Sequence, residues 1–201
     1  MPDAMPKPSA TGRGTTDKRA AILDAALELF VELGFHGTAV PLLAKRAGVG
    51  AGTIYRYFEN KEALVNVLYG EWKEKLATHL LSGFSPGGEP KAQFMGLWRR
   101  MSDFAAQYPT AYAFIEIHHH AAYLDAAAHE VEQRYLQMAV MYIQNAQAEG
   151  KYRDGPPEVL WSLVEGAFIG LARFSRGGRL ELTPEVIEFS GNAAWELVRR
   201  R

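Results

Sequence analysis

A short stretch rich in glycine and aromatic residues, Gly48–Phe58, limits the folds that are open to this chain. A helical pattern precedes it at residues 38–47, and a longer one follows from Lys61. Glycine favours tight turns because it has no β-carbon. The stretch therefore predicts a turn followed by a short helix, in which Ile54 and Phe58 lie four residues apart and face inward. Its hydroxyl, aromatic and cationic side chains are left to face outward, as in a helix-turn-helix.

Two further helices are expected before this stretch. Residues 17–33 place apolar side chains every three or four positions, and Gly34 follows as a stop signal. Thr38 is expected to cap the next helix, with Pro41 in its first turn, where no backbone donor is needed. The expected inward-facing residues of the two helices are Ile22, Ala26, Leu29, Leu33, Val40, Leu43, Ala44 and Ala47.

The rest of the chain also has the pattern of helices. A long helix is expected after Asn60, which is placed to cap it, and a loop rich in glycine and proline follows at residues 82–90. No alternating run of β-branched residues suggests a strand. The sequence predicts an all-α fold of about nine helices, of which the last five are expected at residues 91–107, 109–120, 124–149, 156–175 and 184–200.

The glycine-rich stretch and the helices around it resemble the DNA-binding signature of the tetracycline-repressor (TetR) family. The resemblance is specific to motifs over roughly residues 17–68, and it concerns only helix number and order beyond them. It implies an N-terminal helix-turn-helix DNA-binding domain at residues 17–62, after an arm at residues 1–16 that we expect to be disordered. It also implies a C-terminal helical domain at residues 63–201 that binds an effector and forms a homodimer.

The function implied by the resemblance is that of a transcription regulator, most often a repressor. Such a protein binds a near-palindromic operator in double-stranded DNA as a homodimer, and a small amphipathic or aromatic effector releases it. Two alternatives stay open, namely a DNA-binding protein with no effector and a metal-responsive regulator. A filled core instead of a cavity would favour the first of these alternatives.

The resemblance also implies which side chains contact DNA. Thr38 and Lys61 match family positions that contact backbone phosphate, although a plain helix cap and a solvated surface lysine are the alternatives. Gly50 and Ala51 stand where many family members carry a polar pair, so fewer groups can read bases at that end of the helix. The expected DNA-contacting residues are Thr38, Thr53, Tyr55, Arg56, Tyr57 and Lys61.

The second half of the chain is rich in aromatic residues interleaved with polar ones. By resemblance, several of them line an effector pocket, whereas the alternative is an ordinary core. Buried hydroxyl and imidazole groups need partners, which a ligand could supply, so we expect a cavity of at least about 300 Å³. The expected ligand-binding residues are Trp98, Met101, Phe104, Tyr112, Phe114, His118, Tyr123, Tyr142, Trp161 and Phe168.

Histidines and small residues suggest two further features. The run from His118 to His120, with Glu116 and His129 nearby, has spacings that could chelate a metal, but an ordinary surface pair of Glu116 and His120 is the preferred interpretation. Small residues at helical spacing suggest close helix packing, either between two subunits or within one chain. They lie in the last two expected helices at Gly166, Gly170, Ile187, Ser190, Gly191, Ala194 and Val198.

Composition excludes several classes of protein. The chain has 201 residues and no cysteine, so it has no disulfide framework or thiolate metal site. Its formal charge is +2 over residues 1–61 and −3 over residues 62–201, which is consistent with a small basic face. No apolar run approaches the roughly 20 residues of a membrane span. We find no catalytic motif and expect no enzyme activity, no cofactor, no membrane association and a cytoplasmic location.

Overall fold

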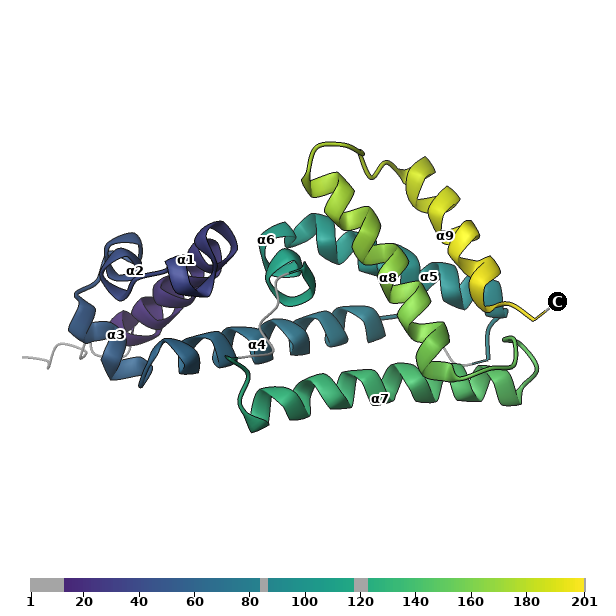
Figure 1. The fold of residues 1–201 in the computed structure, drawn as a ribbon, viewed down its shortest axis with the longest axis horizontal. Helices are drawn as coiled ribbons and strands as arrows, with labels where there is room; N and C mark the ends of the chain where they lie inside the picture. Colours follow the sequence, from purple (N-terminus) through teal and green to yellow (C-terminus); the bar gives the residue numbers. More distant parts are fainter. Residues whose placement is uncertain (1–12, 84–86, 118–122, 201) are drawn as a thin grey trace, which may run out of the picture. The chain divides into compact units, whose positions relative to one another are not determined.

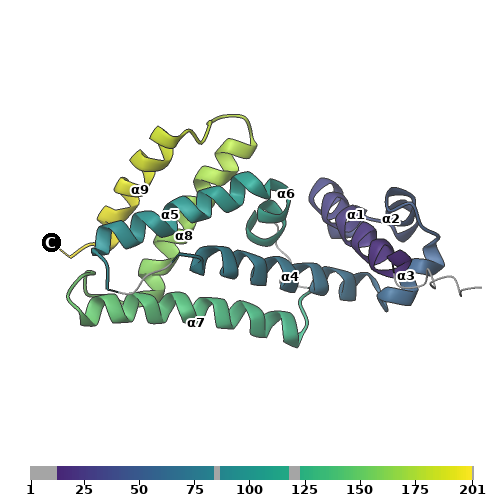
Figure 2. The same cartoon turned by 180° about the vertical axis from the view of Figure 1, so that it is seen from behind.

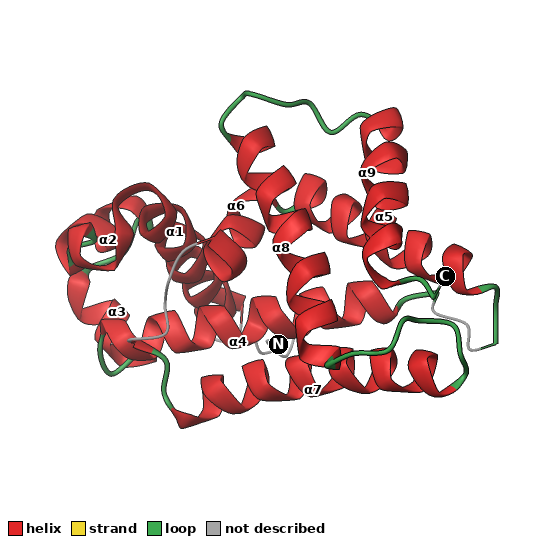
Figure 3. Cartoon of the chain, turned by 45° about the vertical axis from the view of Figure 1, so that its right-hand side comes forward, coloured by secondary structure: helices red, strands yellow, loops and turns green. Residues whose placement is uncertain are grey.

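The computed structural model describes residues 13–83, 87–117 and 123–200, and the regular structure of these residues is helical (Figure 3). Within them, the expectation of an all-α fold is confirmed, since the one β-type pairing is an isolated bridge between Tyr152 and Arg199. The chain divides into two compact units, Met1–Leu68 and Tyr69–Arg201. The division falls inside the fourth helix, a few residues after the boundary expected from the sequence.

Residues 13–68, the described part of the first unit, form three helices and the start of a fourth. These are α1 (Arg13–Gly37), α2 (Val40–Arg46), α3 (Ala51–Tyr57) and α4 (Lys61–Leu81). Because α1 begins at Arg13, residues 13–16 of the expected disordered arm are helical, while residues 1–12 lie outside the described part of the chain. The core is apolar and includes Ile22, Ala26, Leu29, Phe30, Leu43, Ala44, Ile54, Phe58, Leu64 and Leu68.

Two glycines set the turns of this unit. Gly34, where the sequence predicted the end of the helix, interrupts α1 with a φ of 71°, and α1 changes direction there before it ends at Gly37. Leu33, expected on the inner face, is instead 48% exposed, and Phe30 is fully buried. Gly48 has a φ of 66° in the turn between α2 and α3, a conformation that costs other residues about 1 kcal/mol or more.

The second unit contains the rest of α4 and the remaining helices (Figures 1 and 2). The α5 helix (Pro90–Gln107) packs against α9 (Pro184–Val198), and α8 (Pro157–Arg176) packs against both α7 (Ala126–Ala148) and α9. Between α5 and α7, a short helix α6 (Pro109–Tyr112) continues into a π-helical turn, η1 (Ala113–Ile117), instead of the single helix expected at residues 109–120.

The small residues of α9 pack within the chain. Gly191 is buried, and a β-carbon there would lie 2.7 Å from Cδ1 of Trp98 and 2.8 Å from Cε of Met95, both on α5. The Trp98 indole also donates a hydrogen bond to the Ser190 hydroxyl at 3.1 Å. Of the two interpretations of this stripe, the intrachain one is therefore correct: Ile187, Ser190, Gly191, Ala194 and Val198 hold α9 against α5.

None of the helices in the described part of the chain is both long enough and apolar enough to cross a membrane.

Candidate nucleic-acid interface and ligand cavities

The α3 helix presents one polar face to solvent. Ile54 and Phe58 are buried as predicted, so residues on the opposite side of α3 face outward. Tyr55 is 55% exposed, Arg56 is exposed, and Thr53 and Tyr57 are half-buried. Arg56 has no ion-pair partner among the described residues, whereas Arg46 of α2 forms ion pairs with two glutamates of α1. The face therefore offers a cation, two phenols and a hydroxyl.

The start of α3 has a bare cap. Gly50 is the N-cap residue, and no side chain accepts a hydrogen bond from the first amides of the helix. Behind it, Arg46 of α2 donates to Glu28 at 2.8 Å and to Glu32 at 3.3 Å, both on α1. Hydrogen bonds and charge from Glu32 and Glu28 raise the pKa of the Arg46 guanidinium. Arg46 thus fixes α2 against α1, and Arg56 is the cation that the face itself presents.

Thr38 has a different role from the one expected. Its side chain is fully buried, and its hydroxyl donates toward the carbonyl oxygens of Gly34 at 2.8 Å and Leu29 at 3.1 Å. The N-cap of α2 is Ala39, without any side-chain cap. Thr38 therefore satisfies carbonyls at the end of α1 instead of capping α2. A hydroxyl buried in this way does not support the expected phosphate contact.

Lys61, at the first position of α4, contacts the backbone of the same segment, where α1 ends and α2 follows. Its ammonium donates to the carbonyl oxygens of Phe35 at 2.6 Å and Thr38 at 3.0 Å, and it lies 4.1 Å from the centre of the Phe35 ring. Asn60 caps α4 as predicted, since its side chain accepts from the amide of Ala63 at 2.7 Å. Lys61 is thus a structural tie in this unit, and one of its three N–H donors remains for a phosphate.

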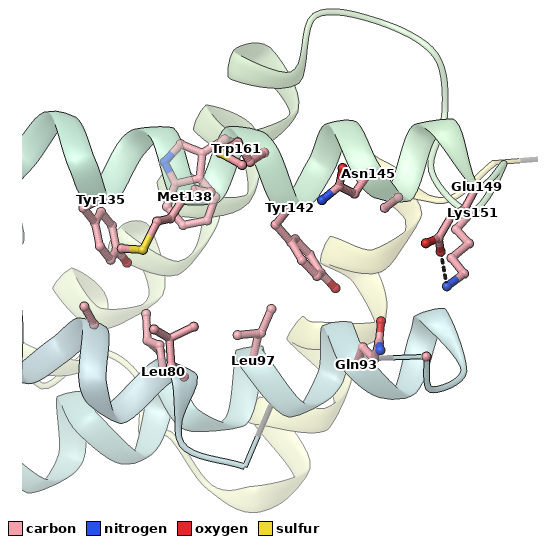
Figure 4. A pocket seen from close by; sticks show the side chains of 16 residues that line it. Leu80, Gln93, Leu97, Tyr135, Met138, Tyr142, Asn145, Glu149, Lys151 and Trp161 are labelled. Atoms are coloured by element: carbon pink, nitrogen blue, oxygen red, sulfur yellow. Dashed lines mark ion pairs between the residues drawn. The ribbon is translucent and has the colours of Figure 1, made fainter. Parts of the chain in front are cut away.

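A ligand-sized cavity of the second unit lies among α4, α5, α7 and the start of α8 (Figure 4). Its volume is about 500 Å³, above the expected minimum, but its lining differs from the expected one. Tyr135, Met138 and Trp161 gather at one end, and the ion pair of Glu149 and Lys151 lies at the other. The remaining lining is mostly apolar: Ala77, Leu80, Leu81, Gly87, Gln93, Leu97, Ala139, Met141, Tyr142, Asn145 and Ala146.

A second cavity of about 410 Å³ has a polar character. Lys73 of α4 and Glu116 of η1 form a buried ion pair in it, with 2.5 Å between Nζ and Oε1. Glu116 is therefore not the surface residue that the sequence suggested, and its expected partner His120 lies outside the described residues. Glu132 of α7 and Glu165 of α8 add two more carboxylates. The other lining residues are Tyr69, Ile115, Leu124, His129, Gln133, Tyr135, Leu136, Trp161 and Ile169.

Glu165 is the most perturbed acid of this cavity. Burial, together with the charge of Glu116, raises the pKa of its carboxyl from 4.5 to about 7, although Lys73 opposes the shift. Trp161, one turn earlier on α8, also lines this cavity. Because the carboxyl titrates near neutral pH, its charge responds to any new charge placed in the cavity.

Most of the expected ligand-binding residues lie in the packed core instead. Trp98, Phe104, Tyr112, Phe114 and Phe168 are almost fully buried, and the Phe168 ring contacts those of Trp98 and Tyr112 edge to face, with centres 5.2 and 5.7 Å apart. These residues line neither large cavity, and Trp98 and Met101 reach only a void of about 60 Å³. For these residues the alternative of an ordinary core is correct.

The other expected ligand residues are placed differently. Tyr142 and Trp161 line the first cavity, and the Tyr142 hydroxyl lies 3.3 Å from that of Tyr152. Tyr123 is half-buried and lines neither large cavity. His118, with His119 and His120, lies outside the described residues.

Comparison with known proteins decides the family. Residues 22–68 match the bacterial regulatory proteins of the tetR family, and residues 69–200 match the tetracyclin repressor-like C-terminal domain. The chain belongs to the TetR family. It is a DNA-binding regulator of transcription, and the proteins that it resembles are regulators, not enzymes.

Individual relatives agree with this assignment. The chain is 48% identical over 59 residues to the fatty acid metabolism regulator protein of Bacillus subtilis, covering 29% of each. It is 32% identical over 83 residues to the transcriptional repressor KstR2 of Rhodococcus jostii, covering 37% of this chain and 41% of that one. These matches span less than half of the curated relatives. A solved TetR-family structure from Shewanella sp. PV-4 is 26% identical and covers 92% of this chain and 99% of its own, with a TM-score of 0.78.

The second cavity of this TetR regulator was not predicted from the sequence, although one signal was available. Lys73 interrupts the buried stripe of α4, since Tyr69 lies four residues before it and Leu76 three after it, and both are buried. A lysine in such a position needs a buried partner. Finding Glu116 as that partner requires the fold, because 43 residues separate the two.

The metal-responsive alternative receives no support from the described residues. They contain no group of three or more histidine, aspartate or glutamate side chains placed to hold a metal ion. His129 lies 3.6 Å from Glu132, one turn away on α7. Its expected partner His120 is outside the described part of the chain.

Apolar side chains are exposed on the outer faces of α8 and α9. Phe189 of α9 is 78% exposed, and Val159, Leu163 and Phe174 of α8 are about half exposed. Gly166 and Gly170 lie on the same side of α8 as Leu163, and a β-carbon at either would meet nothing within 4 Å. This α8–α9 outer face is distinct from the α9 stripe that packs on α5.

Proposed function

We propose that the protein is a ligand-responsive transcriptional repressor that binds a near-palindromic operator as a homodimer and is released by a small amphipathic effector. The observation that carries the proposal is the cavity of about 500 Å³ in the second unit, taken together with the polar face that α3 presents in the first unit. A DNA-binding protein without an effector would have no need of such a cavity. The repressor role follows the name of one relative, KstR2, and is typical of the family.

The chemistry of the first cavity suits an amphipathic ligand. Apolar side chains, among them Leu80, Leu97 and Met138, form most of its lining, and polar groups such as Gln93 and Asn145 stand toward one end. A few polar groups in an otherwise apolar cavity orient a ligand, whereas the apolar area supplies most of the affinity. An elongated molecule with one polar end matches this distribution.

The proposed dimer uses the α8–α9 outer face. Exposed apolar side chains that cluster on one face mark an interaction surface, and the exposed Gly166 and Gly170 permit close approach of a second helix. A two-fold dimer presents two copies of α3, and each copy reads one half-site. In this proposal the effector acts through α4, the helix with residues in both units, and changes the distance between the two α3 helices of the dimer. The proposed site of action is the cytoplasm, with the DNA that the protein reads.

The DNA-binding part is tested on sequences selected from a random duplex pool with the full-length protein. Arg56→Ala is expected to weaken binding and to lower the salt dependence, because it removes a cation from the α3 face. Thr53→Ala is expected to change base preference with little effect on the salt dependence. Lys91→Ala, which removes an exposed cation from α5, is the control. Unchanged binding by both α3 variants would refute the assignment of this face.

The effector part is tested by filling the cavity. Ala139 lines the cavity on α7, whereas Ala127 is exposed on the same helix. Ala139→Trp is expected to bind DNA normally but to lose release by single-chain amphiphiles of either charge, and Ala127→Trp is expected to keep it. If no amphiphile of either charge binds the wild-type protein or releases DNA, the proposed effector response is wrong.

A further inference from the structure

The polar second cavity combines carboxylates with aromatic rings. Glu116, Glu132 and Glu165 come from η1, α7 and α8, and the rings of Tyr69, Tyr135 and Trp161 complete the wall. Tyr69 and Glu132 line this cavity together with Trp161 and Glu165, so each ring shares the cavity with a carboxylate. Rings beside carboxylates are the groups that bind ammonium ions, since the π face and the carboxylate both attract positive charge.

The chain itself already places an ammonium group in this environment. The Lys73 nitrogen lies 4.9 Å from the centre of the Tyr135 ring and 5.7 Å from that of Tyr69, while its ion pair with Glu116 is buried. Lys73 is only 5% exposed. A buried ammonium held by a carboxylate and two rings shows that the walls of this cavity are suited to a cation.

We propose that the second cavity binds the ammonium group of an amphipathic organic cation, whose apolar part lies in the first cavity. The inference rests on the proposed effector response and names the chemical class of the effector. Tyr135 and Trp161 line both cavities, with ring centres 6.0 Å apart, so this pair forms the wall that the two cavities share. A cation bound beside the pair would place its headgroup against the carboxylates and its tail along Met138 and Leu97.

The balance of charge favours a cation over an anion. Lys73 is paired with Glu116, and His129 lies 3.6 Å from Glu132, whereas Glu165 forms no ion pair with any described residue. A carboxylate ligand would add a further negative charge to this set and would have to compete with Glu116 for Lys73. An ammonium ligand would pair with Glu165, which has no cation of its own.

Binding of a cation is expected to release a proton from Glu165. The groups that face Glu165 are Lys73 and Tyr69 of α4, Glu116 of η1, and Tyr135, Glu132 and His129 of α7. Burial and Glu116 hold its pKa at about 7, so close to half of the molecules carry the proton at pH 7. A cation nearby lowers that pKa, and the release approaches about half a proton for each ligand bound at pH 7.

The test uses two probes with the same tail and opposite charge, decyltrimethylammonium and decanoate, added to the full-length protein below their micelle concentrations. Calorimetry in phosphate and in Tris gives affinity and proton release, because the two buffers differ in ionisation enthalpy. The cation is expected to bind at least about tenfold more tightly than decanoate, a difference of about 1.4 kcal/mol. Release of operator DNA is measured separately by fluorescence anisotropy.

Two variants separate a direct role of Glu165 from a general loss of charge. Glu165→Gln keeps the shape of the side chain. It is expected to weaken binding of the cation roughly tenfold and to abolish proton release, while decanoate binds no more weakly than to the wild type. Glu130→Gln removes an exposed carboxylate from α7 and is expected to change nothing. Equal weakening of both probes by Glu165→Gln would indicate damage to the cavity and would count against the inference.

The outcomes distinguish this inference from the effector response itself. Tighter binding of decanoate, with release of DNA, would overturn the cation class and support the effector response. Binding of the cation at the cavity without release of DNA would support the inference and contradict the effector response for this ligand class. If neither probe binds, the inference is wrong.

Discussion

Lys61 should stabilise the first unit more than it contributes to DNA affinity. Lys61→Met keeps the apolar stem but removes the ammonium that donates to the carbonyl oxygens of Phe35 and Thr38 and lies over the Phe35 ring. A net hydrogen bond contributes about 1 kcal/mol, more from a charged donor, and an exposed cation–π contact about 0.5–1 kcal/mol. The expected loss is therefore about 2 to 3 kcal/mol. Lys45→Met, which removes an exposed cation from α2, should cost little.

Hydrogen exchange can locate this loss. All 4 tryptophans lie in the second unit, at positions 72, 98, 161 and 195, so their fluorescence reports only on that unit. The slowest amides of α1 should exchange roughly 30 to 150 times faster in Lys61→Met, the effect of about 2 to 3 kcal/mol, while the fluorescence transition stays unchanged. DNA binding of the variant, measured against salt, should lose at most about 0.9 in slope, one phosphate contact. Exchange equal to that of Lys45→Met would refute the structural role.

Three further changes test the second unit. Gly191→Ala should destabilise it by about 1–3 kcal/mol in urea unfolding, because the new β-carbon would overlap Trp98 and Met95; an unchanged midpoint would show that α5 and α9 are loosely packed. Phe189→Arg should convert a dimer to a monomer in sedimentation, and a persistent dimer would exclude the α8–α9 outer face. The pKa of Glu165 is raised in the folded protein, which favours its protonated carboxyl. The contribution of this carboxyl to the free energy of unfolding is therefore complete below about pH 4.5 and is lost as pH rises through about 7. Between pH 5 and 8 the free energy of unfolding of the wild type should therefore fall by up to about 3 kcal/mol relative to that of Glu165→Gln. If the two proteins lose stability in parallel as pH rises, the raised pKa of Glu165 is wrong.

The helix-turn-helix could be predicted because its signals are local. Ile54 and Phe58 are buried, Gly48 sits in a conformation that favours glycine, and Asn60 caps α4, each as its position in the sequence indicated. Thr38 shows where such local signals end. A threonine between two helices can cap the second or satisfy the carbonyls of the first, and the bend at Gly34 brings two of those carbonyls to its hydroxyl.

The ligand cavities could not be assigned in this way. Helical periodicity identifies an apolar face, but a face can border either a core or a cavity, and the two have the same pattern. Trp98 and Phe168 contact each other across α5 and α8, whereas Tyr142 and Trp161 border the open space. That difference depends on how far apart the helices lie. The distance between helices is in turn set by residues that are far apart in the sequence. Gly191, by letting α9 approach α5, is one of them.

Lys61 and Lys73, both on α4, show how the same residue type can serve different purposes. Lys61 is half-buried and its acceptors are neutral carbonyls, so it keeps part of its hydration and the contact mainly joins backbone segments. Lys73 is buried, and its acceptor is the equally buried carboxylate of Glu116. Desolvating two charges costs several kcal/mol, which their attraction offsets only with good geometry. A pair of this kind is a poor way to gain stability alone, and a hydrophobic pair would serve as well. Its presence beside Glu165 and an open cavity is better explained by a need for charge at that place, which a site for a charged ligand has and a core does not.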